Sequence, residues 1–247
     1  MIITLTNGKG GTGKTTLSIY LAINLCNQGR KVLFIDLDPN CSASEALGKI
    51  LCENNSKQLL SGRNVNPYIL KKSKDGKGQL DLIPSDLDLD MLQNVTDVQL
   101  RMQIKKQDFV SKYDHIIIDP PGTWNSQTRN AIFAADFIKI VGKCSPLDFV
   151  ATQNYFNKLS ECCLDADIQV ICNSYSKAAD PDGILDNYKK TFGDWFFPNP
   201  IPKMNSLKRL TKNPDYHIRT DIEEKLAYFV DCCSLAGKTS EVLEVAE

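Results

Sequence analysis

The sequence has almost no net charge and no long apolar segment. Its 29 basic and 30 acidic residues leave a formal charge of −1 at pH 7, which excludes a chain that is basic over its whole length. No apolar run reaches the roughly 18 residues that a membrane-spanning helix requires. The chain enters an apolar, β-branched pattern at Ile2 instead of a charged targeting segment, so we expect a soluble, cytoplasmic protein.

Cysteines are present, but they lack the spacing of a metal-binding or redox motif. The nine cysteines include two adjacent pairs, Cys162-Cys163 and Cys232-Cys233, and no C-x-x-C. The absent C-x-x-C spacing is the one typical of zinc sites and thioredoxin-like sites. The scattered pattern instead indicates reduced thiols in an intracellular protein.

Charge is nevertheless uneven along the chain. Residues 48–79 hold seven Lys or Arg against Glu53 and Asp75, and residues 203–219 hold five against Asp215 alone. The segment 221–247 is acidic. Local basic patches are therefore expected on a nearly neutral protein.

Apolar, β-branched runs alternate with helical patterns, which predicts an α/β fold with a mostly parallel, twisted sheet and helices on both faces. We expect one domain over residues 1–247, with a weakly structured connection at 52–78. Strands are predicted at Ile2–Thr6, Lys31–Asp36, Gln79–Ile83, His115–Asp119, Phe137–Val141 and Ile168–Cys172. Helices are predicted at Lys14–Gln28, 97–109, 125–135, 147–163, 182–192 and 221–235.

A glycine-rich loop follows the first predicted strand. It fits G-x-x-x-x-G-K-[ST], the pattern of a loop that wraps nucleotide phosphates, and it reads Asn7-Gly8-Lys9-Gly10-Gly11-Thr12-Gly13-Lys14-Thr15-Thr16. The four glycines permit the backbone path that points several N–H groups at the anion. Lys14 can then reach the β- and γ-phosphates, Thr15 can offer its hydroxyl to Mg²⁺, and the next helix presents its positive dipole end. The loop therefore predicts an ATP site, with Lys9 as an additional lysine.

Polar side chains follow several predicted strands at their carboxyl ends, where parallel sheets bind ligands. Asp119 ends the strand His115–Asp119 and is the carboxylate expected to hold Mg²⁺ or its waters. Asp36 and Asp38 come at the end of the second strand. In an extended segment they point the same way, so one can support the metal shell while the other orients an attacking water.

Three of these elements together resemble the deviant Walker A ATPases of the ParA/MinD group: the loop at 9–16, Asp36-Leu37-Asp38-Pro39, and Asp119-Pro120-Pro121-Gly122. The resemblance covers nearly the whole chain in order. It implies an ATPase that closes as a sandwich dimer, with Lys9 crossing to the partner's phosphates. It also implies that Lys14 and Thr15 serve their own nucleotide, that Asp38 positions the hydrolytic water, and that Asp119 supports Mg²⁺.

One further segment and one further residue also resemble features of this group or of related P-loop ATPases. The run Ser145-Pro146-Leu147-Asp148-Phe149 resembles the segment before a dimer-facing helix in small plasmid-partition ParA proteins. Asn173, at a predicted strand end, is where related P-loop ATPases often place an adenine-recognising residue. The sequence departs from the group at Lys139 and Lys143, where apolar or small residues are usual, and our explanation is that this strand lies at an exposed sheet edge.

Three functions compete within the group, and each requires a different accessory. Partition requires a nonspecific DNA-binding surface, whereas a MinD-like regulator requires a basic amphipathic helix at the end of the chain. Residues 239–247 are acidic, which disfavours the membrane alternative. An iron–sulfur carrier needs several cysteines at a dimer interface, and Cys144 is the single candidate. The candidate DNA contacts are Lys203, Lys208, Arg209, Lys212 and Arg219.

From the resemblance and these required features, we predict a ParA-type ATPase for plasmid or chromosome partition. It is expected to form a homodimer with ATP and Mg²⁺, to bind DNA nonspecifically without binding membranes, and to hydrolyse ATP slowly until a ParB-like centromere-binding partner stimulates it. The chain begins directly with the strand before the phosphate loop, so no N-terminal helix-turn-helix is expected. The expected location is cytoplasmic and nucleoid-associated. The alternative is a MinD-like spatial regulator or another cargo-positioning ATPase.

Overall fold

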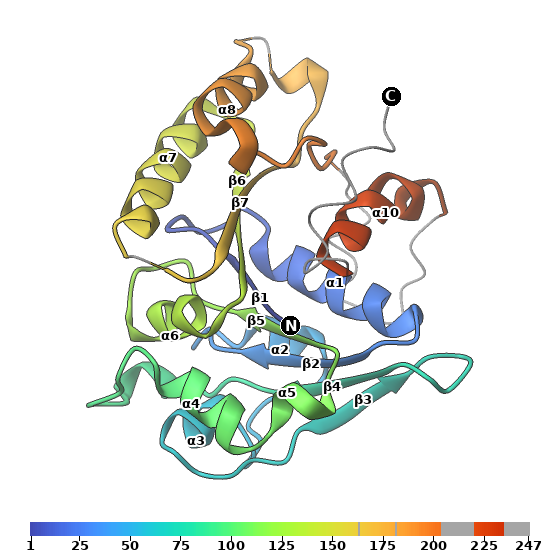
Figure 1. Ribbon diagram of the computed structural model, residues 1–247, viewed down its shortest axis with the longest axis vertical. Helices are drawn as coiled ribbons and strands as arrows, with labels where there is room; N and C mark the ends of the chain where they lie inside the picture. Colours follow the sequence, from blue (N-terminus) through green and yellow to red (C-terminus); the bar gives the residue numbers. More distant parts are fainter. Residues whose placement is uncertain (163, 181, 204–219, 235–247) are drawn as a thin grey trace.

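In the computed structural model, the chain folds around one seven-stranded sheet (Figure 1). It describes residues 1–162, 164–180, 182–203 and 220–234. The strand order is β3-β4-β2-β5-β1-β6-β7, with β3 antiparallel to β4 and all other neighbours parallel. The strands are β1 (Ile2–Thr6), β2 (Lys31–Asp36), β3 (Tyr68–Lys72), β4 (Gln79–Ile83), β5 (His115–Asp119), β6 (Phe137–Lys143) and β7 (Asp167–Asn173).

Helices cover both faces of the sheet, so the predicted mostly parallel α/β fold is confirmed. Figure 1 shows α1 and α10 on one side of the sheet and α6 and α7 on the other. The first face carries α1 (Lys14–Asn27), α2 (Ser42–Ala46) and α10 (Thr220–Ser234). The second carries α3 (Ser56–Leu60), α4 (Gln99–Lys106), α5 (Phe109–Lys112), α6 (Ser126–Ala134), α7 (Pro146–Ser160) and α8 (Ile184–Phe192).

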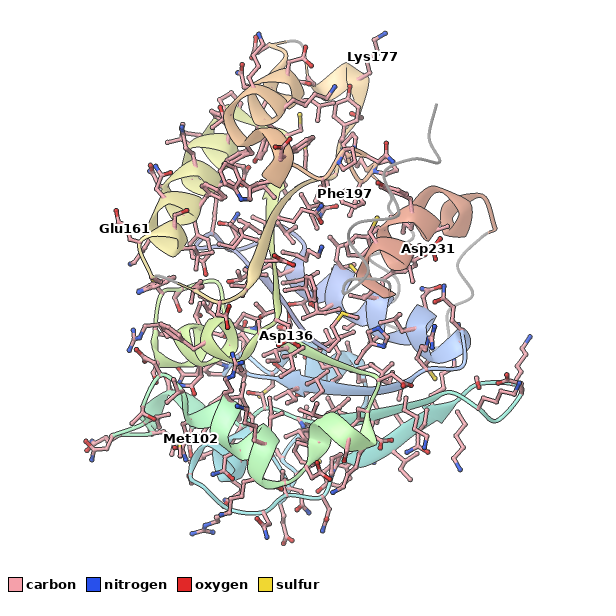
Figure 2. All side chains as sticks on the ribbon, in the orientation of Figure 1. Met102, Asp136, Glu161, Lys177, Phe197 and Asp231 are labelled. Carbon is pink, nitrogen blue, oxygen red and sulfur yellow. The ribbon has the colours of Figure 1, made fainter. Side chains whose placement is uncertain are left out.

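The central strands are apolar on both sides because both sides are covered. In β5, Ile117 packs into the cluster under α1, whereas Ile116 and Ile118 pack toward α4 and α6. Phe197 continues the first cluster beyond β7. Its ring lies 5.3 Å from that of Tyr228 and 6.1 Å from that of Phe229, which places it against α10 (Figure 2).

Two expectations from the sequence were wrong. The connection at 52–78 contains the helix α3, capped by the side chain of Asn55, and the strand β3. These elements are five residues each and β3 pairs on one side only, so neither produces a long periodic pattern. The strand that carries Lys139 and Lys143 is not a sheet edge, because β6 lies between β1 and β7.

Lys139 is instead a buried lysine with its own partner. The residue is 5% exposed, and Nζ donates to Oε1 of Gln169 on the neighbouring strand at 2.7 Å. A buried ammonium group requires such a hydrogen bond. The polar residue in the middle of an apolar strand is therefore satisfied across the β6–β7 pair.

The strand register brings the carboxyl ends of the parallel strands to one edge of the sheet. Asp36 of β2 lies opposite Asp119 of β5, and Lys143 of β6 lies opposite Asn173 of β7. The loop after β1 emerges between these pairs, since β1 lies between β5 and β6. No helix in the described part of the chain is long and apolar enough to cross a membrane.

Candidate nucleotide-binding site

The glycine-rich loop joins β1 to α1 and is anchored at both ends. At its start, the Asn7 amide donates to the carbonyl of Val141 at 2.9 Å and to Thr152 Oγ1 at 3.1 Å. At its end, Gly13 has a φ of 99°, which L side chains rarely adopt. A Cβ on Gly13 would also lie 2.3 Å from Nδ2 of Asn173. Glycine is therefore needed at this position for conformation and for space.

The loop borders a cleft of about 930 Å³ at the carboxyl edge of the sheet. This volume is within the range of small-molecule sites. Gly8 and Lys9 do not line the cleft: a Cβ on Gly8 would lie 2.9 Å from the ring of Tyr155, so this glycine packs against α7. The lining residues are Gly10, Gly11, Thr12, Gly13, Lys14, Thr15, Thr16, Leu17, Asp38, Asn40, Ser42, Gly122, Thr123, Lys143, Cys144, Ser145, Asn173, Ser174, Pro202 and Lys203.

Lys14 is the buried cation of the cleft. The residue is 6% exposed, and Nζ donates to the carbonyl of Lys9 at 3.2 Å. Burial lowers the pKa of Lys14, while the nearby charges of Asp119 and Asp38 raise it. A Cβ on Gly122 would lie 3.2 Å from Nζ, so the glycine of the Asp-Pro-Pro-Gly turn leaves room for this ammonium group.

Asp119 is fully buried beside the loop and is only partly hydrogen-bonded. Its Oδ1 accepts from Ser18 Oγ at 3.0 Å, whereas Oδ2 has no hydrogen-bond partner among the described residues. Burial, followed by the charge of Asp36, raises the pKa of Asp119 to about 7, and the Thr15 and Ser18 hydroxyls and Lys14 act in the opposite direction.

Asp36 and Asp38 occupy different environments, contrary to the expectation that they point the same way. Asp36 is fully buried and does not line the cleft: Oδ2 accepts from Ser44 N and Oγ at 2.9 and 2.6 Å, and Oδ1 accepts from Asp38 N. Burial raises its pKa to about 6. Asp38 lines the cleft, because β2 ends at Asp36 and the chain turns there. The extended geometry assumed from the sequence therefore ends before it reaches Asp38.

The donor set fits a hard divalent cation at Asp119 and Thr15. Oδ2 of Asp119 is buried and has no hydrogen-bond partner among the described residues. The Thr15 hydroxyl acts to lower the pKa of the same carboxyl group. Mg²⁺ prefers oxygen ligands and keeps several waters. Asp36 fits such a role less well, because each of its oxygens already accepts a hydrogen bond.

Lys9 turns away from the cleft toward α7. Its Nζ lies 2.9 Å from Oδ1 of Asp148, with side-chain exposures of 39% and 10% for the two residues. Asp148 is fixed in turn by Ser145, whose hydroxyl donates to Oδ2 at 2.5 Å and accepts from the Asp148 backbone N–H at 3.2 Å. Two exposed apolar side chains flank this pair on α7: Leu147 is 78% exposed and Val150 is 51% exposed.

Asn173 lines the cleft and supports the loop directly. Its Nδ2 donates to the carbonyl of Thr12 at 2.7 Å, and its Oδ1 accepts from the backbone N–H of Ser174. Adenine recognition by this residue stays a prediction.

Of the residues predicted to contact DNA, Lys203 alone lies in the described part of the chain. Lys203 borders the nucleotide cleft, and its backbone N–H donates to the carbonyl of Tyr175 at 2.8 Å. The other four, Lys208, Arg209, Lys212 and Arg219, lie outside the described residues.

Sequence reasoning missed three contributors to the site. Ser18 binds Asp119, and Tyr155 hydrogen-bonds Thr6 Oγ1 at 2.6 Å while its ring packs on Gly8. Lys143 lines the cleft and was noticed only as a departure from the group. Ser18 lies one helical turn beyond Lys14 and could have been found from that spacing. Tyr155 is too remote in sequence for any local signal.

Together, the glycine-rich loop between the first strand and helix, the buried Lys14 and the strand-end Asp119 define a P-loop nucleotide-binding protein. A family model described as an AAA domain, AAA_31, matches residues 1–165. The chain belongs to this family of ParA/MinD-type P-loop ATPases.

Named relatives agree with this assignment. The sporulation initiation inhibitor protein Soj of Bacillus subtilis is 29% identical over 82% of this chain and 84% of its own length. The chromosome partitioning protein ParA of Caulobacter vibrioides is 31% identical over 58% of this chain, and that match spans only 56% of the relative. A plasmid partition protein of Borrelia burgdorferi, solved with AMPPNP, superposes with a TM-score of 0.76 at 23% identity, over 96% of this chain and 98% of its own. At that identity the superposition supports the fold alone.

Proposed function

We propose that the protein is a partition ATPase of the ParA type, which closes as a homodimer around ATP, binds DNA nonspecifically, and is released when a ParB-like partner stimulates hydrolysis. The observation that carries this proposal is the different placement of two lysines. Lys14 lies buried in its own cleft, whereas Lys9 points out of that cleft beside an exposed apolar surface. The names of the partition relatives support plasmid or chromosome partition as the process in which the ATPase acts.

Within one protomer, the cleft supplies the elements needed for phosphoryl transfer. Lys14 and the N–H groups at the start of α1 neutralise phosphate charge. Thr15 and Asp119 are the residues that would hold Mg²⁺, which would neutralise further charge on the phosphates. Asp38, which lines the cleft, would orient the attacking water, while Asp36 holds the turn through Ser44. Catalysis in such sites depends mainly on positioning and electrostatics.

A second protomer completes the site in this proposal. Lys9 is paired with Asp148 of its own chain, and the side chain of Asp148 is only 10% exposed. Releasing Lys9 toward a partner's phosphates would leave Oδ1 of this carboxylate without its cation, a cost that the contacts of Lys9 with the phosphates must offset. Leu147 and Val150 would be buried by the same approach, which provides apolar area for the dimer.

The DNA-bound form would place the protein on the nucleoid in the cytoplasm. Lys203, Lys208, Arg209, Lys212 and Arg219 are the contacts proposed from the sequence. A dimer carries each of these cations twice, so its affinity for DNA would fall more steeply as the salt concentration rises.

Size-exclusion chromatography and retention of arbitrary duplex DNA, each with ATP, ADP or no nucleotide, test the proposal. We expect a dimer and salt-sensitive DNA binding with ATP only. Lys14→Ala is the control, because it removes the buried phosphate-binding cation and should prevent both effects. Liposome binding without DNA binding would instead indicate the MinD-like alternative.

A further inference from the structure

The β3–β4 hairpin carries a basic surface at the edge of the sheet farthest from β7. The turn between the strands reads Ser73-Lys74-Asp75-Gly76-Lys77-Gly78. Lys72, Lys74 and Lys77 are exposed, and Lys71 is partly buried. Figure 1 shows the hairpin projecting from the body of the molecule. This Lys-rich segment has no role in the nucleotide site.

Two further cations lie beside the hairpin. Arg30 and Lys31 are exposed at the start of β2, and Lys31 is opposite Gln79 in the β2–β4 register. A Cβ on Gly29 would lie 3.7 Å from Cβ of Lys77, so the turn before β2 contacts the hairpin. We call this surface the basic ribbon; its members are Arg30, Lys31, Lys71, Lys72, Lys74 and Lys77.

None of the six cations of the basic ribbon forms an ion pair with a described residue. The one carboxylate in the turn, Asp75, is engaged locally: it accepts hydrogen bonds from the Ser73 hydroxyl and from the backbone N–H of Lys77. The Ser73 hydroxyl also accepts from the Gly78 N–H at 2.7 Å, which ties the two ends of the turn together. Lys74 and Lys77 are thus presented on a braced turn and are available to an external anion.

The position of the basic ribbon separates it from the nucleotide. Because β3 is antiparallel to β4, the turn lies at the amino end of β4, while the cleft lies at the carboxyl ends of the parallel strands. A five-residue strand spans roughly 15 Å. A ligand at the ribbon therefore does not compete with ATP, and a dimer formed through the cleft face leaves the ribbon of each protomer exposed.

We propose that the basic ribbon binds the phosphate backbone of duplex DNA. A two-stranded ribbon is narrow enough to enter the major groove, and unpaired lysines on a projecting turn suit phosphates spaced along a duplex. The turn holds no apolar side chain to insert into a lipid surface, and the exposed Ile69 is at the other end of β3. This inference rests on the proposed DNA-binding function and adds a second surface to the contacts proposed from the sequence.

The test compares Lys74→Gln/Lys77→Gln with the matched control Lys105→Gln/Lys106→Gln, which removes two exposed lysines from α4. Binding of both variants and the wild type to arbitrary duplex DNA is measured with ATP across a range of salt concentrations. We expect the ribbon variant to bind at least about tenfold more weakly, with a salt slope smaller by about 1 for each phosphate that the missing lysines no longer neutralise. Its basal ATP hydrolysis and thermal unfolding should be unchanged.

Three results would overturn the inference. Equal losses of affinity in the ribbon variant and the control would show a general charge effect, and wild-type affinity in the ribbon variant would remove the ribbon from DNA binding while leaving the proposed function intact. If the wild type fails to bind DNA with ATP, both proposals fail. In that case, vesicles of phosphatidylserine and phosphatidylcholine that bind the wild type but not the ribbon variant would assign the surface to lipid.

Discussion

Replacing Asp119 by Asn should stabilise the nucleotide-free protein at high pH. Burial raises the pKa of Asp119 from 3.8 to about 7, and each unit corresponds to about 1.4 kcal/mol. A raised carboxyl pKa means that the native state holds the proton more tightly than the unfolded chain, so stability falls as pH rises from about 4 to about 7. Relative to a carboxyl group that stays protonated in both states, the titration of Asp119 therefore lowers the free energy of unfolding by roughly 4 kcal/mol at pH 8, but only about 2 kcal/mol at pH 5.

Asparagine removes this penalty and keeps an oxygen that can accept from Ser18. Urea unfolding of the wild type and Asp119→Asn is measured at pH 5 and at pH 8, without nucleotide or Mg²⁺. The free energy of unfolding of the variant minus that of the wild type should be roughly 2 kcal/mol larger at pH 8 than at pH 5. Asp36 is present in both proteins, but its charge contributes to the raised pKa of Asp119, so the comparison reports on the two carboxyl groups together. A stability difference that does not change with pH, or that favours the wild type more as pH rises, would refute the reasoning.

Three other substitutions test individual contacts. Gly13→Ala places a side chain at a φ of 99° and against Asn173, so we expect at least about 1 kcal/mol of lost stability and weakened nucleotide binding; unchanged thermal unfolding and nucleotide titration would contradict this. Tyr155→Phe leaves the buried Thr6 hydroxyl without its 2.6 Å partner and should cost about 1 kcal/mol in urea unfolding, whereas a gain in stability would show that the bond is not favourable. Asp38→Ala should trap the ATP-bound dimer in size-exclusion chromatography, and rapid phosphate release by that variant would remove Asp38 from the mechanism.

The sequence was sufficient for the parts of the site that depend on local order. Parallel strands end at one edge, so Asp119 and the glycine-rich loop could be placed together from their positions after apolar runs. The family resemblance added the expectation that Lys9 serves a partner. The length and type of most strands and helices followed from continuous apolar runs and helical periodicity.

The remaining features depend on contacts between distant segments. The pairing of Lys9 with Asp148 joins residues on different elements, and the Lys139–Gln169 bond is invisible without the β6–β7 register. Asp36 and Asp38 were expected to point the same way because the extended strand was assumed to continue to Asp38, whereas β2 ends at Asp36. The short β3 was missed because an edge strand next to a polar turn lacks a continuous apolar run.

Mixing two inactive variants tests the central claim most directly. Lys9→Ala keeps Asp38 but lacks the crossing lysine, and Asp38→Ala keeps Lys9 but lacks the residue that orients the water. The two proteins are combined before ATP is added, and phosphate release is measured for each alone and for the mixture. Our account predicts that the mixture hydrolyses ATP although neither variant does so alone, because one site of each mixed dimer holds an intact Asp38 and the partner's Lys9. A mixture as inactive as its components, or a wild-type rate in Lys9→Ala alone, would contradict it.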